Sequence, residues 1–568
     1  MSAQQWGRRP CPPDSDEPLT IDAPVLNIAA RFAEMAAAAP DRAAIIHPVR
    51  RGRQTEFRTR SFRELDELTH RYAHALAAAG AARGMRTILM VRPGPDFFAL
   101  SFALFRIGAV PVMIDPGMGL RSMARCLANV AAEAFVGIPP AHVFRLLNPA
   151  AFRSVRIIIT VGRRWFWGGH RLDELAPAVW SPAAPVATRP DETAAILFTT
   201  GSTGPPKGVV YTHATFDAQV RLLESAFGFQ AGETDLATFP LFALFDAALG
   251  VTAVIPDMDP TRPGFADPAG IVAAVRDHAC STMFGSPALL DRVGRYGRTA
   301  GLRMPTLKRV ISAGAPVPPV VLERFAAMLA DDAEIVTPYG ATEALPVTHI
   351  GHHEILSDTA ARTAAGMGTC VGRSAAGVEV RVIHISDDAI DEWRDELVVP
   401  DGEIGEIVVS GPVVTREYFA LPEATRAAKI HDGDRIWHRM GDVGWKDEQG
   451  RLWYCGRKSH RVVTSTGTLF TVPCEAVFNQ HPLVRRTALV GIGRAPRQTP
   501  IFCVELEPDA RRADRERVRR ELLEIGRRSE HTQAVTTILF HPRFPVDIRH
   551  NAKIFREKLA RWSARRLR

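Results

Sequence analysis

Short apolar runs alternate with helical stretches in the N-terminal part of the chain. Residues 87–91 and 110–114 are almost entirely apolar, and a helical pattern separates them. Ser61 and Glu64 form a capping-box pattern, which predicts a helix that runs toward Ala79. Strands that are apolar on both faces need helices on both sides of their sheet. The pattern therefore predicts an α/β fold built from helix-covered sheets.

The character of the sequence changes twice toward the C-terminus. From about residue 371, short strand patterns separated by turns predict a β-rich subdomain. After residue 457, strand-like runs and two helical stretches suffice for a small α+β domain. A chain of 568 residues is too long for one core. We therefore predict an unstructured tail at residues 1–20, a large domain at residues 21–457 that includes the β-rich subdomain, and a small domain at residues 458–568.

The positive charge is concentrated near the C-terminus. Residues 509–568 contain 17 Lys and Arg against 8 Asp and Glu, although the whole chain carries a net charge of only +8. Charges of both signs are mixed at helical spacing, without interleaved aromatic residues. We interpret this segment as a solvated helix face, with an anionic partner as the alternative, and we expect no nucleic-acid binding.

Cysteine usage and hydropathy bear on the compartment. The seven cysteines are scattered and form no CxxC pair, which argues against a disulfide framework and against structural zinc. The most apolar stretch, residues 97–114, contains Arg106, Gly108 and Pro111, which would break a membrane span. No secretion signal opens the chain. We expect a cytoplasmic protein without a transmembrane segment.

The strongest chemical signal is the loop TTGSTGPPKG at residues 199–208. Backbone N–H groups at glycines, hydroxyl groups and the ammonium of Lys207 are the groups that bind an anion. The loop is not a Walker loop, because Lys207 precedes the last glycine and a strand pattern follows. We therefore predict a phosphate-binding loop rather than an ordinary hairpin turn.

This loop resembles the signature loop of the adenylate-forming superfamily, which includes acyl-CoA synthetases, luciferases and peptide-synthetase adenylation domains. Three further motifs resemble that superfamily in the same order: YGATE at residues 339–343, GD at residues 441–442, and the lysine of RHNAK at residues 549–553. The resemblance spans nearly the whole chain. It implies an ATP-dependent, AMP-forming enzyme that needs Mg²⁺, with a small mobile domain that turns about a hinge at Lys458 or Ser459.

The resemblance implies roles for residues at the phosphate end of ATP. The residues that would cradle the β- and γ-phosphates are Thr199, Thr200, Gly201, Ser202, Thr203, Gly204 and Lys207. Glu343 would ligate Mg²⁺, a hard ion that prefers carboxylate and phosphate oxygens. Thr342 would bind the α-phosphate.

It also implies roles at the nucleoside and at the reacting carboxylate. Tyr339, with Gly340 beside it, would lie against adenine, and Asp442 and Arg457 would hold the ribose hydroxyls. Lys553 would bridge the carboxylate and the α-phosphate, neutralising charge as two anions meet. The residue before Lys553 is alanine, where the superfamily commonly has glycine.

Segments between the motifs narrow the resemblance. Residues 238–263, 312–319 and 545–560 resemble the β-lactone synthetases of bacterial long-chain olefin biosynthesis. In that family a long-chain 2-alkyl-3-hydroxy acid is adenylated, and its own 3-hydroxyl then closes the β-lactone and releases AMP. The implied partners are this small-molecule acid and other olefin-pathway enzymes such as a β-lactone decarboxylase.

An apolar run and two histidines are candidates for substrate contacts. The candidate acyl-pocket residues, with a buried structural helix as the alternative, are Phe239, Leu241, Phe242, Leu244 and Phe245. His550 and His213 are candidates by residue type for the base that takes the hydroxyl proton.

Two other functions stay open. One is a fatty acyl-CoA ligase or fatty acyl-AMP ligase of the same fold. The other is a non-catalytic nucleotide-binding regulator, which would be expected to lose charged groups that are costly to keep. All four such groups are present, namely Lys207, Glu343, Asp442 and Lys553.

Overall fold

The computed structural model describes residues 26–52, 54–198, 206–510, 514–546 and 554–567. Several predicted features lie outside the described residues. They are the tail at residues 1–20, the loop residues Thr199, Thr200, Gly201, Ser202, Thr203 and Gly204, the base candidate His550, and Lys553. Among the described residues no helix is long and apolar enough to cross a membrane.

A seven-stranded sheet occupies the N-terminal part, in the order β7-β6-β5-β3-β4-β8-β9. Its strands are β3 (Arg86–Met90), β4 (Val110–Ile114), β5 (Ala134–Gly137), β6 (Ile157–Thr160), β7 (His170–Arg171), β8 (Thr193–Phe198) and β9 (Gly208–Thr212). Neighbouring strands are parallel except β8 and β9, which form an antiparallel pair. The two apolar runs of the sequence are therefore strands, as predicted.

The helix predicted after Ser61 is also present. Helix α2 (Phe62–Ala78) begins with a capping box, in which the Glu64 N–H donates to Ser61 Oγ at 3.2 Å. The Ser61 N–H donates in return to Glu64 Oε2 at 2.9 Å. This reciprocal pair satisfies two N–H groups that would otherwise lack partners at the helix start.

A fourteen-stranded sheet runs through the rest of the large part, in the order β17-β18-β20-β21-β16-β15-β14-β13-β12-β10-β11-β1-β2, with β19 paired to β20. Its first strands are β1 (Ala43–Arg51), β2 (Gln54–Ser61), β10 (Thr234–Ala237), β11 (Thr252–Val254), β12 (Thr282–Phe284), β13 (Arg309–Ile311) and β14 (Glu334–Ala341). The others are β15 (Ala344–Gly351), β16 (Thr369–Ser374), β17 (Glu379–Ile383), β18 (Gly405–Ser410), β19 (Lys429–Asp432), β20 (Arg435–Lys446) and β21 (Leu452–Arg457).

The pairing of this sheet changes at β14. Strands from β11 to β14 are parallel, whereas β14–β15 and β15–β16 are antiparallel. The β-rich segment that begins near residue 371 thus continues the large sheet, because Thr348 of β15 pairs with Ser374 of β16. Residues at the β14–β15 turn therefore face elements from both parts of the sheet.

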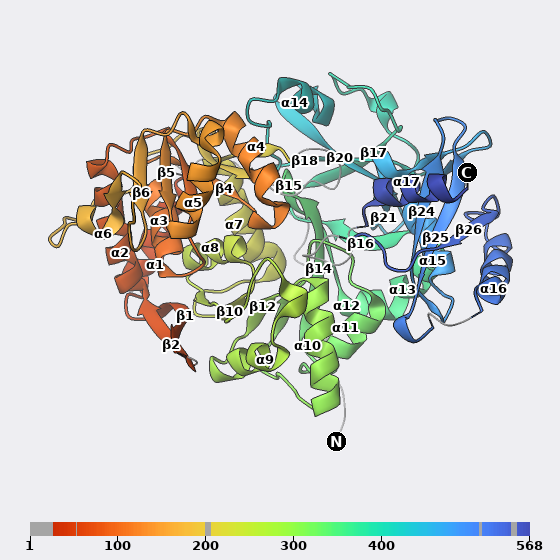
Figure 1. The fold of residues 1–568 in the computed structure, drawn as a ribbon, viewed down its shortest axis with the longest axis horizontal. Helices are drawn as coiled ribbons and strands as arrows, with labels where there is room; N and C mark the ends of the chain where they lie inside the picture. The colour runs from red at the N-terminus through yellow and green to blue at the C-terminus, as the bar shows by residue number, and fades with distance from the viewer. Residues whose placement is uncertain (1–25, 53, 199–205, 511–513, 547–553, 568) are drawn as a thin grey trace.

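Helices cover and separate the two sheets (Figure 1). Those of the large part are α1 (Ile28–Ala38), α3 (Pro95–Arg106), α4 (Leu120–Val130), α5 (Pro139–Leu147), α6 (Leu172–Leu175), α7 (His213–Phe227), α8 (Pro240–Leu249), α9 (Pro268–Asp277), α10 (Pro287–Ala300), α11 (Pro319–Ala326), α12 (His352–Glu354), α13 (Ala360–Ala364) and α14 (Pro422–Ala428). The largest core joins apolar side chains of both sheets to those of α1, α3, α7 and α8. Helices on both faces satisfy the apolar strands, as expected.

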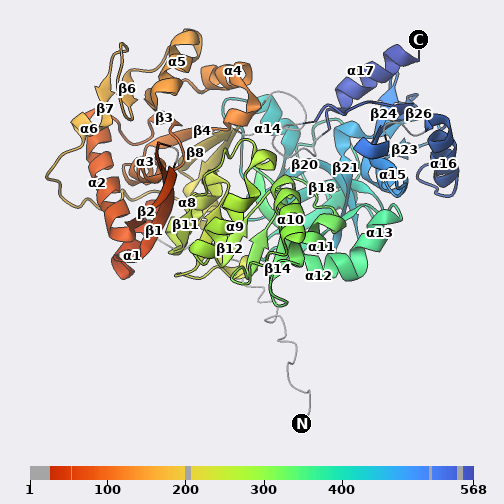
Figure 2. The same ribbon diagram turned by 60° about the horizontal axis from the view of Figure 1, so that its bottom comes forward.

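The C-terminal residues form a small α+β unit at one end of the molecule, opposite β5 and β6 (Figures 1 and 2). Its strands are β22 (Val462–Val463), β23 (Thr468–Leu469), β24 (Val484–Ile492), β25 (Thr499–Leu506) and β26 (Thr537–Phe540), and its helices are α15 (Thr471–Phe478), α16 (Arg515–Arg527) and α17 (Arg556–Arg566). Helix α16 buries Val518 and Leu522 and pairs Arg517 with Glu521 at 3.7 Å on its outer side. This arrangement fits a solvated, mixed-charge helix face.

A buried charge cluster ties the start of this unit to the large sheet. Glu406 of β18 is fully buried, and its carboxylate accepts hydrogen bonds from Arg439 of β20 at 2.8 and 3.1 Å. Lys458, directly after β21, lies 2.9 Å from the same carboxylate. Two cations thus compensate one anion that is removed from water. The predicted hinge position Lys458 is therefore held by the large part of the chain in this structure.

We expect Glu406→Gln to lower the free energy of unfolding by about 3–5 kcal/mol, because it leaves two buried cations without their anion. Denaturant unfolding followed by tryptophan fluorescence would measure it. Glu403→Gln, at an exposed position three residues earlier, is the control and should unfold like the wild type. Equal midpoints for both variants would contradict a structural role for the cluster.

Candidate active site

A cavity of about 720 Å³ opens at the carboxyl ends of β12, β13 and β14, between them and strands β20 and β21. All of the predicted nucleotide and metal residues that the structure describes line it: Lys207, Tyr339, Gly340, Thr342, Glu343, Asp442 and Arg457. The acyl-pocket candidates Phe239, Leu241 and Phe242 line it as well. Segments that are far apart in the sequence therefore meet in one cavity, as the order of motifs predicted.

Lys207 enters the cavity from the hairpin between β8 and β9. A side chain at the next residue, Gly208, would place its Cβ 2.6 Å from the Phe198 ring, so a larger residue would require that ring to move. The Lys207 ammonium lies 4.4 Å from the centre of the Tyr418 ring. Such a cation–π contact holds the ammonium without neutralising it. Its charge stays available for an anion in the cavity.

Glu343 lies on the turn between β14 and β15. Its Oε1 accepts a hydrogen bond from the Tyr418 hydroxyl at 2.6 Å, and its backbone carbonyl accepts from the N–H and Oγ1 of Thr415 at 2.9 and 3.0 Å. Oε2 has no hydrogen-bond partner among the described residues. A carboxylate in the cavity lining, beside the predicted phosphate site, fits Mg²⁺, which commonly binds one or two carboxylates together with phosphate oxygens.

Thr342 is fixed through its backbone. Its carbonyl accepts a hydrogen bond from the buried Tyr211 hydroxyl at 2.5 Å. Burial raises the pKa of Tyr211 far above its usual value, so the hydroxyl keeps its proton and donates at any physiological pH. Sequence reasoning missed Tyr211, Thr415 and Tyr418, since a lone hydroxyl in a strand or loop carries no motif.

Asp442 and Arg457 are cross-strand neighbours in β20 and β21. Arg457 Nη1 lies 3.1 Å from Asp442 Oδ1, and the Tyr339 hydroxyl donates to Asp442 Oδ2 at 2.7 Å. Burial and the Asp442 carboxylate raise the pKa of Tyr339 well above its usual value. The three residues predicted to contact adenine and ribose therefore form one connected group at the side of the cavity.

The remaining sequence candidates lie elsewhere. Phe245 lines a smaller apolar cavity next to the main one, and Leu244 is buried in the core. His213 starts helix α7, is buried and is not among the cavity-lining residues, so the structure does not bring it to the site. Burial lowers the pKa of His213 to about 4. We therefore do not retain it as a base.

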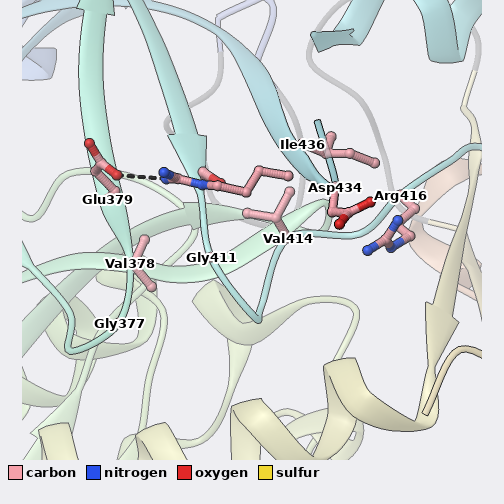
Figure 3. Close-up of a pocket in the computed structure, with 10 residues that line it drawn as sticks. Gly377, Val378, Glu379, Gly411, Val414, Arg416, Asp434 and Ile436 are labelled. Carbon is pink, nitrogen blue, oxygen red and sulfur yellow. Dashed lines mark hydrogen bonds and ion pairs between the residues drawn. The ribbon is translucent and has the colours of Figure 1, made fainter. Parts of the chain in front are cut away.

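A second hollow lies on the outer side of β17, β18 and β20 (Figure 3). Two of its charged groups pair with each other: Arg435 lies 2.6 Å from Glu379. None of the predicted site residues lines it. The chemistry expected from the sequence therefore belongs to the first cavity.

The sequence profile described as AMP-binding enzyme matches residues 32–419. This match covers more than half of the chain and includes the phosphate loop and the Glu343 turn. The chain belongs to the AMP-binding enzyme family. The prediction of an ATP-dependent, AMP-forming ligase is thereby confirmed.

Two relatives within this family are similar along nearly their whole length. An olefin beta-lactone synthetase of Stenotrophomonas maltophilia is 50% identical over 95% of this chain and 98% of its own length. An olefin beta-lactone synthetase of Xanthomonas campestris is 48% identical, covering 95% of this chain and 97% of its own. A long-chain-fatty-acid–CoA ligase, FadD13 of Mycobacterium tuberculosis, is 26% identical over 76% of this chain and 80% of its own.

Solved structures share the fold. The amide bond synthetase McbA of Marinactinospora thermotolerans superposes with a TM-score of 0.76 at 22% identity, covering 94% of this chain and 99% of its own. ATP-bound MatB of Rhodopseudomonas palustris gives 0.75 at 20% identity, covering 96% and 99%. The predicted α/β class with a small C-terminal domain is confirmed at the level of fold.

Two further residues of this family member adjoin the site without belonging to a predicted motif. Lys429, at the start of β19, is fully buried, and its ammonium donates to the Thr415 carbonyl. Burial, with a smaller contribution from Lys207, lowers the pKa of Lys429 to about 7, while Glu343 opposes this shift. His438 lines the cavity and donates from Nδ1 to the Ala428 carbonyl at 3.2 Å, which leaves Nε2 as an acceptor.

Lys429 is a positioning residue in this arrangement. It holds Thr415, and Thr415 holds the Glu343 backbone. The only sequence signal was a lysine beside the apolar start of a strand pattern. Its importance follows from complete burial, since an ammonium is rarely taken out of water without a role.

We expect Lys429→Met to lower the rate of adenylate formation about tenfold or more while the fold is kept. The pH dependence of stability tests whether Lys429 is a buried titratable group and does not only fill space in the core. Because the folded-state pKa of about 7 lies below the ordinary lysine value of 10.5, only the unfolded chain binds this proton between these limits. The free energy of unfolding of the wild type should therefore rise with pH across this window, and this rise should be smaller in the variant.

Denaturant unfolding at pH 7, 8.5 and 10 would measure the difference. Lys308→Met, at an exposed position, is the control and should keep the wild-type pH dependence. A Lys429→Met variant with the wild-type pH dependence would show that Lys429 is not the buried, proton-poor group described above.

Proposed function

We propose that this protein is an ATP-dependent β-lactone synthetase. It adenylates the carboxylate of a long-chain 2-alkyl-3-hydroxy acid and closes the β-lactone with release of AMP and pyrophosphate, in the synthesis of long-chain alkenes. The observation that carries the proposal is the identity of 50% and 48% to two olefin beta-lactone synthetases over 95% of the chain. The cavity supports the proposal, because one part of its lining is apolar and another part carries the charged residues predicted to bind ATP.

The polar wall suits the first half-reaction. Lys207 and Glu343, with the loop at residues 199–204 and a Mg²⁺ ion on Glu343, would hold the triphosphate and keep pyrophosphate in place as it leaves. Asp442 and Arg457 would hold the ribose. Lys553, outside the described residues, would neutralise the approaching carboxylate and α-phosphate. Opposite charges that are fixed before the reaction lower the barrier without reorganisation.

The apolar wall suits the second half-reaction. Phe239, Leu241, Phe242 and Phe284 line the same cavity. They would exclude water, which competes with the hydroxyl for the activated carbonyl. Attack by a hydroxyl of the same molecule is favoured by up to about 7–11 kcal/mol in well-oriented cases, part of which offsets ring strain. Internal attack is therefore a reasonable route to product release.

A long-chain acyl-CoA ligase is the second candidate. It would use the same cavity for the adenylate, and FadD13 shares 26% identity over 76% of the chain. Coenzyme A would then supply the nucleophile in place of the internal hydroxyl. The two candidates differ only after the adenylate has formed, so a product assay separates them.

Two further parts of the proposal concern organisation. We place the boundary between the large domain and a small mobile domain at residues 457 and 458, where the buried Glu406 holds Lys458. We also propose that the β-lactone is consumed by a decarboxylating enzyme, because loss of CO₂ from a disubstituted β-lactone gives an alkene. Such an enzyme is the expected pathway partner.

We expect Glu343→Gln to reduce carboxylate-dependent exchange of labelled pyrophosphate into ATP and to raise the Mg²⁺ concentration needed for half-maximal exchange. The amide keeps the shape but removes the charge that attracts the cation. Glu417→Gln is the matched control, since Glu417 is exposed and adjoins Tyr418. An unchanged Mg²⁺ requirement in Glu343→Gln would remove the metal role.

The product assay uses ATP, Mg²⁺ and a long-chain 2-alkyl-3-hydroxy acid without coenzyme A. We expect AMP over many turnovers, together with a product that is lighter than the acid by one water and has a strained-lactone carbonyl band. The same acid without its 3-hydroxyl should stop after one equivalent of AMP-bound intermediate, because adenylation needs only the carboxylate. Stalling on both acids, relieved by coenzyme A with a thioester as product, would replace this proposal by the ligase.

A further inference from the structure

A smaller cavity of about 80 Å³ lies directly behind the acyl side of the main cavity. The two cavities share the lining residues Phe239, Phe242, Phe284, Ala313, Pro338 and Leu345. The smaller one is mostly apolar, yet three polar side chains also line it: Gln219, Asp235 and Asp246. Buried polar groups in folded proteins nearly always have hydrogen-bond partners, so an unpartnered one in an apolar cavity needs a physical explanation.

Asp246 lies on helix α8 and is only 4% exposed. Its Oδ2 is buried without a hydrogen-bond partner among the described residues. Burial and the neighbouring Asp235 carboxylate raise the pKa of Asp246 well above its usual value. This shift favours the neutral carboxyl group, which offers both an O–H donor and an acceptor oxygen.

Gln219 reaches the same cavity from helix α7. Its Nε2 donates to the Leu345 carbonyl at 3.1 Å, which fixes the orientation of the amide because a carbonyl can only accept. The Oε1 atom is consequently an acceptor, and it is buried without a partner among the described residues. Leu345 follows Ala344 at the start of β15, so this amide is anchored two residues beyond the Glu343 turn.

Asp235 differs from these two residues. Its Oδ1 accepts a hydrogen bond from the Thr282 hydroxyl at 2.7 Å, so its side chain has a partner. Its pKa is raised to about 6 by burial, while Thr282 and Arg309 act in the opposite direction. Asp235 therefore contributes to the raised pKa of Asp246, and its own carboxylate has a hydrogen-bond partner.

We propose that Asp246 and Gln219 form a hydroxyl-binding subsite within the acyl pocket. A hydroxyl is both donor and acceptor, so it can accept from the Asp246 carboxyl and donate to Gln219 Oε1. An alkyl group at the same place would leave both buried atoms without partners, which costs more than a hydrogen bond contributes. The subsite would thus select acids that carry a hydroxyl.

This inference rests on the proposed function for the identity of the ligand. In a 3-hydroxy acid, one carbon separates the hydroxyl-bearing carbon from the carboxyl carbon, so the two groups lie close together. The smaller cavity adjoins the main one through six shared residues, which lets a carboxylate in the main cavity place its hydroxyl in the subsite. The same contact would hold the nucleophile beside the activated carbonyl.

The test measures pyrophosphate exchange with a 2-alkyl-3-hydroxy acid and with the matched acid that lacks the hydroxyl. A site built to hydrogen-bond a hydroxyl discriminates strongly against the analogue without it. We expect the wild type to prefer the hydroxy acid in kcat/KM. We expect Asp246→Leu and Gln219→Leu to reduce this preference about 100-fold, through loss of the hydroxy acid's kcat/KM alone. Asp246→Asn, which keeps a donor and an acceptor, should retain most of the preference.

Folding and packing are controlled in the same experiment. Asp246→Leu removes a buried carboxyl without a partner, so its thermal unfolding temperature should not fall, and Asp331→Leu at an exposed turn is the matched control. If Asp246→Leu fails to fold, Gln219→Leu and Asp246→Asn still decide the question. A wild type without preference, or an equal loss for both acids in the leucine variants, would overturn the subsite.

The outcome is separable from that of the proposed function. A hydroxyl preference that disappears in Asp246→Leu, in an enzyme that makes no lactone, would support the subsite and refute the synthetase. Lactone formation by the wild type, with a hydroxyl preference that the variants leave unchanged, would support the synthetase and refute the subsite.

Discussion

Glu343 sits on the turn where the large sheet passes from parallel to antiparallel pairing, and three side chains from two distant segments hold that turn. The Tyr418 hydroxyl binds its carboxylate, Thr415 binds its carbonyl, and Tyr211 binds the carbonyl of Thr342. Because Lys429 in turn binds Thr415, a fully buried lysine supports the whole arrangement. The held turn places Glu343 in the lining of the cavity, where the proposed Mg²⁺ and triphosphate would bind.

The polar and apolar parts of the cavity lining differ in how their side chains are paired. The polar wall concentrates charges, and each is tied to a partner: Arg457 to Asp442, and Lys458 to Glu406. The apolar wall excludes water and has few polar groups, so the unpaired atoms of Asp246 and Gln219 stand out there. Buried polar atoms are nearly always satisfied in folded proteins. Where they are not, a ligand with the missing hydrogen-bonding groups is a physical explanation.

Much of the fold was predictable because it depends on short-range patterns. The capping box of Ser61 and Glu64 starts α2, and the apolar runs become β3 and β4 with α3 between them. The structure brings Lys207, Glu343, Asp442 and Arg457, which come from separate motifs, into the lining of one cavity. His213 shows the limit of this reasoning. Its residue type suited a base, but the start of α7 is packed into the interior, away from the cavity.

The sequence by itself determined the α/β class and the family, because these depend on local residue order and on motifs whose spacing is written in the chain. Only the tertiary structure decided which side chains form hydrogen bonds with distant residues. Tyr339 and Asp442 are 103 residues apart, and Gln219 and Leu345 are 126 apart, yet each pair is hydrogen-bonded. The burial that lowers the pKa of Lys429 and raises that of Asp246 likewise depends on every segment packed around them. Desolvation and hydrogen-bond satisfaction are properties of the assembled interior, so no local pattern encodes them.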